Sequence, residues 1–326
     1  MTSIARIEAA ARRLSGEVRR TPLLSSPFLD AIAGRRVWVK AECLQHTGSF
    51  KFRGAWSAVS ALTPDQRRKG VLAYSSGNHA QGMALAASRH SAPAVILMPA
   101  DAPRVKIDNT RALGAEVVLY DRAGGQDRDA IGARISAERG LTLVRPYDDA
   151  EVIAGQGTTG LEIAEQAAEA GIDTAEVLVC CGGGGLSSGI ALAFEARAPG
   201  LTVRTVEPEG FDDMARSLAT GTRQRNATAS GSICDAIVTP TPGELTLPVL
   251  ARLAGAGLVV SDAAAEHAMA LAFARLRIVL EPGGAVALAA ALFQPEALGG
   301  ADVIVVASGG NVDMHVFAAA MQRHPV

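Results

Sequence analysis

The segment EVLVCCGGGGLSS, residues 176–188, joins a run of apolar residues to four consecutive glycines and then to a helix-forming stretch. A short apolar run such as 176–181 is typical of a buried strand, and residues 187–197 are typical of a helix. Four glycines in a row allow positive φ angles and a close approach of the backbone to a ligand. Because N–H groups at the start of a helix attract phosphate, this segment predicts a phosphate site at a strand–helix turn.

The same alternation of strand and helix extends in both directions along the chain. Further strands are predicted at 37–40, 70–75, 94–99, 116–121, 202–208 and 302–308, and helices at 78–90, 126–139, 159–171, 187–197 and 263–275. Near-continuously apolar strands alternating with helices predict an α/β fold with a mainly parallel sheet covered on both faces. A chain of 326 residues, 48% of them hydrophobic, suffices for two domains, or for one large α/β unit with a smaller lobe.

Polar or glycine-rich sequence follows four of the predicted strands. The segments concerned are residues 75–79, 182–185 and 308–311, together with Glu207 at the end of its strand. Ligands of open α/β sheets gather just beyond the carboxyl ends of the strands. The sequence therefore predicts that these four segments meet at a single cleft.

Charge and hydropathy exclude two classes of partner. The formal net charge is −2 and the pI is about 6.3, without the basic stripe that a nucleic-acid-binding protein carries. No apolar run approaches the roughly 18 residues of a membrane span. We expect neither a nucleic-acid partner nor a membrane segment.

The first residues of the chain and its cysteines indicate where in the cell the protein is expected. The start of the chain is arginine-rich, but Glu8 and Glu17 argue against a targeting peptide, so an amphipathic surface helix is expected. The four cysteines form no CxxC pair, which favours a reducing compartment and a role as small core residues. These are Cys43, Cys180, Cys181 and Cys234. A cytoplasmic protein is predicted.

Lysine is rare, and one lysine stands in an unusual place. Only four of the 31 basic residues are lysine, so a retained lysine suggests a need for an amine that can lose its proton. Lys51 lies in residues 47–54, TGSFKFRG, where a helix is expected to begin with Ser49 as its cap. The positive end of a helix dipole disfavours a charged amine and so favours a neutral nucleophile. From this segment alone, a solvated helix lysine is the other interpretation.

A dinucleotide is the main alternative for the phosphate ligand. Such a site has the pattern GxGxxG with an acidic residue about 20 positions later, and Glu207 lies near that position. Gly183 and Gly185 are followed by Ser188 where the third glycine should stand. The dinucleotide fingerprint is therefore incomplete.

Four ordered motifs, SFKFRGA, SSGNHAQG, CGGGGL and SGGN, carry a family resemblance that runs from about Thr21 to Asp313. The chain resembles the tryptophan-synthase-β-like (fold type II) pyridoxal 5′-phosphate enzymes, and within them the threonine/serine dehydratase and serine racemase branch. The resemblance implies two lobes, each a mainly parallel twisted sheet with helices on both faces, and a cofactor in the cleft between them. Residues 1–52 and 148–326 would form the large cofactor-binding domain, and residues 53–147 the small one.

The resemblance also implies roles for residues that hold the cofactor. Lys51 would be the Schiff-base lysine and proton shuttle, and Phe50 would pack beside the cofactor ring. Asn78 would donate a hydrogen bond to the ring 3-oxygen. The phosphate would lie on Gly182, Gly183, Gly184 and Gly185.

Three further residues would surround the ring. Ser308 would face the pyridine nitrogen, where a hydroxyl leaves a weaker electron sink than a carboxylate and so favours loss of a β-leaving group over transamination. Ser76 would lie on the opposite face near the substrate carboxylate, as a second catalytic acid/base in racemases of the family. Glu281 would have a secondary role near the pyridine edge.

A metal is implied by a further spacing. Glu207, Phe211 and Asp213 match a pattern that, in serine racemase and related dehydratases, binds Mg²⁺ or Ca²⁺ through two carboxylates and the middle backbone carbonyl. Oxygen ligands of this kind suit hard cations. A solvated acidic loop is the other interpretation of the same residues.

The predicted activity is β-elimination of water and ammonia from a small β-hydroxy amino acid, with threonine or serine as the expected substrate. Residues 145–149, RPYDD, and 152–157, VIAGQG, resemble threonine dehydratases more than racemases. Serine racemase and hydroxyaspartate ammonia-lyase activities stay open as alternatives. A nicotinamide-dependent dehydrogenase and a non-catalytic phosphate-ligand sensor are more remote.

Regulation and assembly follow from the same resemblance. The chain ends at Val326, soon after the SGGN motif, so a C-terminal isoleucine-binding domain and feedback control are not expected. The expected partners are a small amino-acid substrate and a second copy of the chain in a homodimer.

Overall fold

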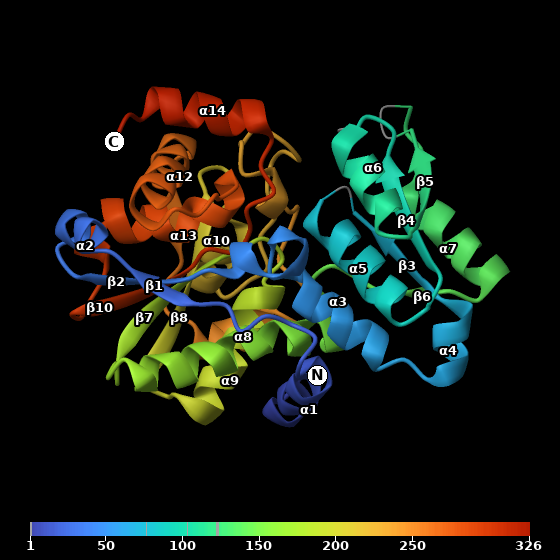
Figure 1. The fold of residues 1–326 in the computed structure, drawn as a ribbon, viewed down its shortest axis with the longest axis horizontal. Coiled ribbons are helices and arrows are strands. Elements are labelled where there is room, and N and C mark those ends of the chain that lie inside the picture. The colour runs from blue at the N-terminus through green and yellow to red at the C-terminus, as the bar shows by residue number, and fades with distance from the viewer. Residues whose placement is uncertain (1, 76, 103, 122–123) are drawn as a thin grey trace.

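A computed structural model describes residues 2–75, 77–102, 104–121 and 124–326, which form two lobes built on two sheets (Figure 1). The larger sheet has the order β1-β2-β10-β7-β8-β9 and the smaller one β5-β4-β3-β6. The strands of the larger sheet are β1 (Leu23–Ser25), β2 (Arg36–Lys40), β7 (Ala175–Cys180), β8 (Leu201–Pro208), β9 (Leu258–Val260) and β10 (Asp302–Val306). Those of the smaller sheet are β3 (Val71–Tyr74), β4 (Ala94–Pro99), β5 (Glu116–Tyr120) and β6 (Thr142–Leu143).

Both sheets are parallel apart from the edge pair β1–β2, which is antiparallel. Every residue of β4 and β10 is buried, as expected of parallel strands covered on both faces. The predicted α/β fold with two mainly parallel lobes is confirmed, and the seven predicted strands all occur with ends shifted by no more than two residues.

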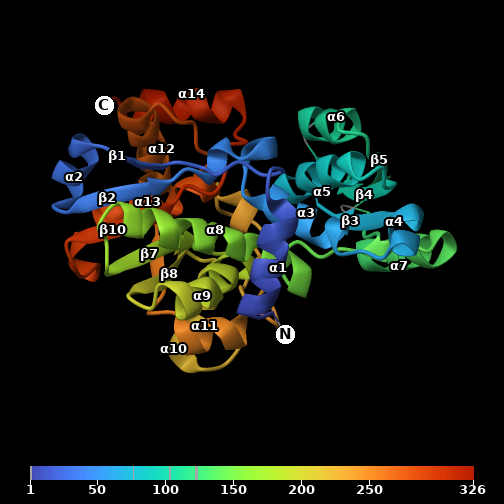
Figure 2. The same cartoon turned by 60° about the horizontal axis from the view of Figure 1, so that its bottom comes forward.

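Helices cover both faces of each sheet. The large lobe carries α1 (Ile4–Leu14), α2 (Pro27–Ala33), α8 (Ala150–Glu169), α9 (Gly185–Arg197), α10 (Asp213–Thr220), α11 (Leu247–Leu253), α12 (Asp262–Leu276), α13 (Pro282–Phe293) and α14 (Met314–Arg323). The small lobe carries α4 (Pro64–Lys69), α5 (Asn78–Arg89), α6 (Arg104–Ala112) and α7 (Arg128–Arg139), and α3 (Lys51–Ser60) lies between the lobes. Short 3₁₀ turns occur at Glu42–Leu44, His46–Gly48, Asp235–Ile237 and Pro295–Ala297. Figure 2 shows α8 and α9 on one face of the large sheet and α12 and α13 on the other.

Several elements lie outside the predicted ranges, among them β1, β6, β9 and α13. The three strands have only two or three residues each, too few for an alternating pattern to show. Helix α13 is rich in small apolar residues and is buried along almost its whole length, so it has no polar face to mark its period. It packs against the central strands of the large sheet and forms part of the core.

The amphipathic helix expected near the start of the chain is α1, which turns Ile7, Ala10 and Leu14 inward. The two sheets lie within the residue ranges expected for the large and the small domain. Because α3 packs on α8 of the large lobe and on α5 of the small one, the domain boundaries stay a prediction. No helix in the described part of the chain is long and apolar enough to cross a membrane.

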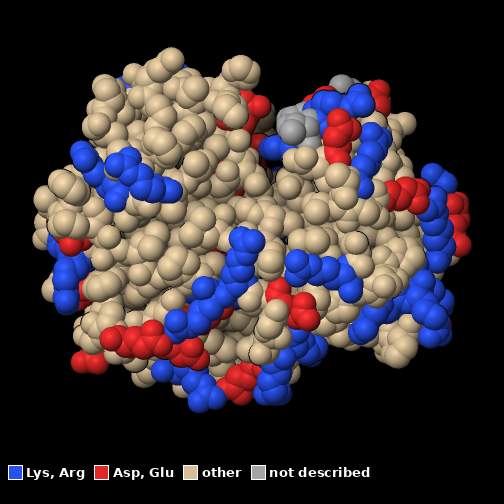
Figure 3. Space-filling model, viewed as in Figure 1, with Lys and Arg blue, Asp and Glu red and all other residues tan. Residues whose placement is uncertain are grey.

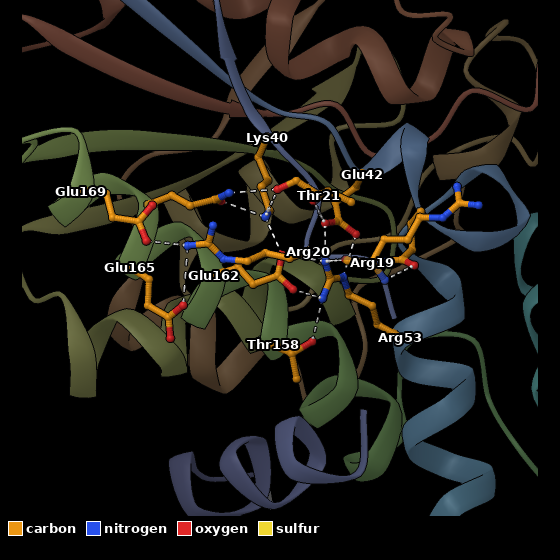
Figure 4. Close-up of polar contacts among 12 residues, drawn as sticks. Arg19, Arg20, Thr21, Lys40, Glu42, Arg53, Thr158, Glu162, Glu165 and Glu169 are labelled. Atoms are coloured by element: carbon orange, nitrogen blue, oxygen red, sulfur yellow. Dashed lines mark hydrogen bonds and ion pairs between the residues drawn. The ribbon is translucent and has the colours of Figure 1, made fainter. Parts of the chain in front are cut away.

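A buried ion cluster fixes α3 to the large lobe (Figure 4). It consists of Lys40, Glu42, Arg53 and Glu162; Arg53 and Lys40 have no exposed surface. The guanidinium of Arg53 donates to Glu42 at 2.8 Å and to Glu162 at 2.7 Å, and the Lys40 amine donates to Glu162 at 2.5 Å. Burial alone would raise the pKa of Glu42, but the charge and hydrogen bonds of Arg53 hold it below its ordinary value.

Candidate active site

A cavity of about 310 Å³ opens between the two lobes, where Figure 3 shows a notch in the surface. Three of the four strand-end segments line it, from β3, β7 and β10, which brings together motifs more than 200 residues apart. The predicted residues found there are Phe50, Lys51, Asn78, Gly182, Gly183, Gly184, Gly185, Glu281 and Ser308. Glu207 was expected at the same cleft but does not line this cavity. Ser76 lies outside the described residues.

Lys51 is the first residue of α3, and its side chain extends into the cavity wall. Its Nζ donates to the Pro146 carbonyl at 3.0 Å and lies 5.0 Å from the centre of the Phe50 ring. Burial lowers the pKa of the Lys51 amine to about 8, although Cys180 and Glu281 oppose the shift. The neutral form of this amine is therefore far more populated near neutral pH than that of a solvated lysine.

The start of α3 differs from the expectation in one respect. Ser49 was predicted to cap the helix, but Phe50 occupies the N-cap position and no side chain caps it. Ser49 is fully buried, and its Oγ has no partner in the described part of the chain. The predicted cap is wrong because β-like pairing of Ser49 with Gly309 extends the chain one residue further before the helix begins.

Asn78 is held in a short chain of hydrogen bonds. Its Nδ2 donates to Glu281 Oε1 at 2.6 Å, and its Oδ1 accepts from Asn311 Nδ2 at 2.7 Å. Asn311 also donates to the Thr47 carbonyl at 2.7 Å. Burial raises the pKa of Glu281 to about 7, and the bond from Asn78 opposes that rise. The contacts of Asn311 with Asn78 and Thr47 were not predicted from the sequence, although its place in the SGGN motif was a signal for them.

The side chains of Tyr147 and Thr246 pack against the glycine turn. A Cβ at Gly183 would overlap the ring of Tyr147, and Gly184 has a φ of +89°. Thr246 Oγ1 donates to the Gly183 carbonyl at 2.6 Å and holds the turn from outside. Helix α9 begins at Gly185, so the N–H groups of this turn have no acceptor within the helix and are available to an anion.

Ser308 follows β10 and is buried at the cavity wall. Its Oγ accepts a hydrogen bond from Cys180 Sγ at 3.0 Å. Its backbone carbonyl accepts from the N–H of Phe50, which ties the end of β10 to the residue before Lys51.

The residues predicted to hold a metal lie at the start of α10. Glu207 is buried and accepts from the N–H groups of Met214 at 2.9 Å and Ala215 at 2.7 Å, so it caps this helix. Burial raises the pKa of Glu207 well above its ordinary value and that of Asp213 to about 6. Asp213 Oδ2 has no partner within the described ranges, and Phe211 is buried nearby. The described residues contain no cluster of three His, Cys, Asp or Glu side chains suited to a metal; the predicted set has two carboxylates, and the site stays a prediction.

Two cations of the small lobe also line the cavity. They are Lys106 on α6 and Arg128 at the start of α7, whose guanidinium lies 5.9 Å from the centre of the Tyr74 ring. Lys106 Nζ lies 3.6 Å from Asp235 Oδ2 of the large lobe. The sequence analysis gave neither cation a role, although Lys106 is one of only four lysines.

Comparison with known proteins identifies the family. The family described as "Pyridoxal-phosphate dependent enzyme" matches residues 14–309, most of the chain. The chain belongs to the pyridoxal-phosphate-dependent enzymes. It is 42% identical to L-threo-3-hydroxyaspartate ammonia-lyase of Pseudomonas sp, over 96% of each chain.

Solved structures agree with this family. Maize serine racemase has a TM-score of 0.91 at 36% identity, covering 99% of this chain and 97% of its own. A threonine deaminase from T.th. has a TM-score of 0.89 at 43% identity, covering 96% of this chain and 99% of its own. The predicted fold type II family, its dehydratase and racemase branch and its cofactor are confirmed.

The cavity of this pyridoxal-phosphate-dependent enzyme fits the cofactor. It contains an amine with a lowered pKa, a turn of four glycines whose N–H groups are available, and Thr239 Oγ1, which is buried without a partner in the described part of the chain. An aldehyde needs a neutral amine and a phosphate needs several donors, and the cavity supplies both.

Proposed function

We propose that this pyridoxal-phosphate-dependent enzyme is an ammonia-lyase that removes water and ammonia from a small L-β-hydroxy amino acid to give a 2-oxo acid. The observation that carries the proposal is the Lys51 amine, buried opposite a glycine phosphate turn and depressed in pKa to about 8. The relatives named as ammonia-lyase and threonine deaminase support this reaction.

We assign the cofactor contacts to the residues that line the cavity. Lys51 would hold the aldehyde carbon, and Phe50 would pack against the ring. The N–H groups of 182–185 and the Thr239 hydroxyl would hold the phosphate. Asn78 Nδ2 keeps a second hydrogen for the ring 3-oxygen, because only one of its two is used by Glu281. The sheet connectivity supports a large domain of residues 1–52 and 148–326 and a small domain of residues 53–147.

The cofactor, when bound, supplies an electron sink for the substrate α-carbon. Lys51 Nζ, uncharged once released, takes the α-proton; an amine with a pKa near the working pH suits this role. Ser308 presents a hydroxyl to the ring nitrogen in place of a carboxylate, which keeps the sink weak and favours departure of the β-hydroxyl. Ser76 remains proposed as the group near the substrate carboxylate.

A second carboxylate on the substrate is favoured by Lys106 and Arg128. Both cations belong to the small lobe and line the cavity. The side chains of serine and threonine carry no charge to pair with them, whereas 3-hydroxyaspartate has a side-chain carboxylate. We therefore propose 3-hydroxyaspartate as the preferred substrate, with threonine and serine as the alternatives.

One assay tests the reaction and its substrate together. Purified protein loaded with pyridoxal phosphate is supplied with L-threonine, L-serine and the 3-hydroxyaspartate diastereomers, and ammonia and 2-oxo acid are measured. Chiral analysis of the remaining amino acid detects racemase activity. Release of ammonia, fastest from a hydroxyaspartate, is expected. Racemisation without ammonia, or no turnover of any substrate, would contradict the proposed function.

We further propose a homodimer and a cytoplasmic location. Large apolar side chains are exposed on neighbouring helices α2, α12 and α14, and such a surface suits a second copy of the chain. They are Phe28, Ile32, Phe273, Met314 and Val316. Sedimentation equilibrium is expected to give twice the mass of the chain.

A structural Mg²⁺ or Ca²⁺ at Glu207, the Phe211 carbonyl and Asp213 is proposed on the basis of the unpartnered Asp213 Oδ2. The raised pKa values of both carboxylates indicate that a positive charge would be favourable there. Thermal unfolding with and without each cation tests it: a rise in the midpoint with either ion is expected, and no rise with either contradicts the site.

A further inference from the structure

Cys180 is a buried thiol in the cavity that the reaction described above does not use. It is the last residue of β7, and it lines the same cavity as Lys51 and Ser308. Strands β7 and β10 are parallel neighbours with Val179 opposite Val306, so Cys180 is level with Ala307 and one position from Ser308. Cys180 Sγ lies 3.0 Å from Ser308 Oγ.

The neighbouring cysteine provides an internal comparison. Cys181 is equally buried, but its Sγ donates to the Gly182 carbonyl at 3.3 Å and it does not line the cavity. Alternate residues of an extended segment face opposite sides. Of these two adjacent thiols, only Cys180 can act on Ser308.

The hydrogen bond from Cys180 restricts what the Ser308 hydroxyl can do. A hydroxyl has one hydrogen and two lone pairs, whereas a thiol is a weak donor and a weaker acceptor. The thiol hydrogen occupies one lone pair of Ser308 Oγ. Apart from the weakly accepting Cys180 sulfur, which donates in this bond, no hydrogen bond from the hydroxyl's own hydrogen occurs among the described residues, so that hydrogen can point into the cavity.

We propose that Cys180 is a positioning residue, whose hydrogen bond to Ser308 sets the serine hydroxyl as a donor toward the cofactor ring nitrogen. The inference rests on the proposed function in that Ser308 faces this nitrogen. A donating hydroxyl favours an unprotonated ring nitrogen, whereas an accepting hydroxyl favours a protonated one. Without the thiol, both lone pairs of Ser308 are free, and the protonated ring becomes more populated.

The thiol stays protonated and therefore remains a donor over the working pH range. Burial raises the pKa of Cys180 to about 11, although the bond to Ser308 and the charge of Lys51 oppose this rise. The titratable groups that face it are Lys51 on α3 and Glu281 at the start of α13. Lys51 lowers the pKa of the Cys180 thiol and Glu281 raises it, and the resulting value keeps the thiol protonated at neutral pH.

The test measures the cofactor-loaded protein by absorbance against pH. A protonated ring nitrogen lowers the pKa of the lysine-bound nitrogen that is conjugated with it, and the visible band reports this second nitrogen. Cys180→Ala is therefore expected to move the titration midpoint of the visible band to lower pH by about half a unit to one unit, as befits one hydrogen bond. Cys180→Ser, which supplies an O–H donor in place of the S–H donor, is expected to have a midpoint close to that of the wild type. Cys181→Ala is the matched control: it truncates an adjacent buried thiol and is expected to lower the thermal midpoint without moving the band.

A second measurement does not depend on the cofactor. The S–H stretching band of Cys180 in the infrared spectrum of the cofactor-free protein is expected to move to higher frequency in Ser308→Ala, because the thiol loses its acceptor. An unchanged S–H band, or a Cys180→Ala midpoint equal to that of the wild type, overturns the role of Cys180. These outcomes leave the proposed function intact if the wild type shows the visible band and releases ammonia; absence of both in the wild type is a failure of the proposed function itself.

Discussion

The buried ion cluster and the cofactor cavity lie at the same end of α3, yet a buried glutamate has a lowered pKa in the cluster and a raised pKa in the cavity. In the cluster Arg53 has carboxylates within 2.8 Å, and the pKa of the buried Glu42 falls below its ordinary value. In the cavity Lys51, two residues away, donates to a carbonyl and has a pKa lowered to about 8, while burial raises the pKa of Glu281 to about 7. Burial is common to both regions, and the charge of Arg53 outweighs it at Glu42, whereas at Lys40 of the same cluster burial still lowers the pKa despite the pair with Glu162.

The largest expected effect comes from removing the reactive amine. Lys51→Ala is expected to abolish the visible absorbance of the lysine-bound cofactor and to lower ammonia release at least about a thousandfold, because the neutral base is lost. Absorbance spectra and the ammonia assay measure both effects. Lys69→Ala, which removes an exposed lysine paired with Asp65, is the control and should behave like the wild type. A Lys51→Ala protein that keeps the band would refute the assignment.

Removing the fixed charge should act on stability instead. Arg53→Ala leaves Glu42 and Glu162 buried without their guanidinium, and the free energy of unfolding in urea is expected to fall by about 3–5 kcal/mol. Arg6→Ala, which breaks a pair between partly exposed side chains, is the matched control and should cost about 1 kcal/mol or less. If the two losses were equal, the cluster would not hold α3 as described.

The two buried carboxylates are expected to give pH dependences of opposite sign in the cofactor-free protein. Folded Glu281 keeps its proton up to about pH 7, whereas the unfolded chain releases it near 4.5, so stability falls as pH rises between these values. Folded Glu42 has a lowered pKa, so its contribution is present above its ordinary value and is lost as pH falls through the lowered one.

Paired variants isolate these contributions. Relative to the wild type, Glu281→Gln is expected to gain about 3 kcal/mol between pH 4.5 and pH 7, while Glu42→Gln shows no such gain. Urea unfolding from pH 4 to pH 8 measures both. If the free energy of unfolding of the two variants changed with pH in the same way, the proposed difference between the buried carboxylates of the cluster and of the cavity would be wrong.

The smallest expected effect concerns substrate choice. Arg128→Gln is expected to raise KM for 3-hydroxyaspartate by up to about fivefold and to leave KM for serine unchanged, because an exposed cation contributes about 1 kcal/mol or less. Arg134→Gln alters an exposed cation of the same helix, bound to Glu138, and serves as the control. Equal changes for both substrates would argue against a carboxylate subsite at Arg128.

The fold and family could be predicted from sequence because the informative residues form short, continuous motifs. Residues 176–188 contain a strand, a turn and the start of a helix, and each has a local signature. The placement of Lys51 beside the glycine turn followed from the resemblance rather than from any local pattern. The lowered pKa was expected from the helix dipole, but burial is its main cause in the structure.

Contacts between distant segments could not be predicted in this way. The bond between Cys180 and Ser308 depends on the register of two strands that are 128 positions apart, and Arg53 meets Glu162 across 109 positions. Neither pair has a fixed spacing in sequence. The prediction that Glu207 lines the cleft was wrong for a related reason. Its strand ends beside the cavity strands, but its carboxylate accepts hydrogen bonds from the N–H groups of α10.

The overlap that any Cβ at Gly183 would make with Tyr147 has a consequence for adaptation and design. In the proposed site the main-chain N–H groups of the turn bind the anion, so no side-chain replacement within the turn would change this binding in small steps. Tighter or looser retention of the cofactor has to be obtained from residues around the turn, such as the hydroxyls of Thr239 and Thr246. Engineering for altered cofactor retention would therefore begin with these two threonines and leave the glycines untouched.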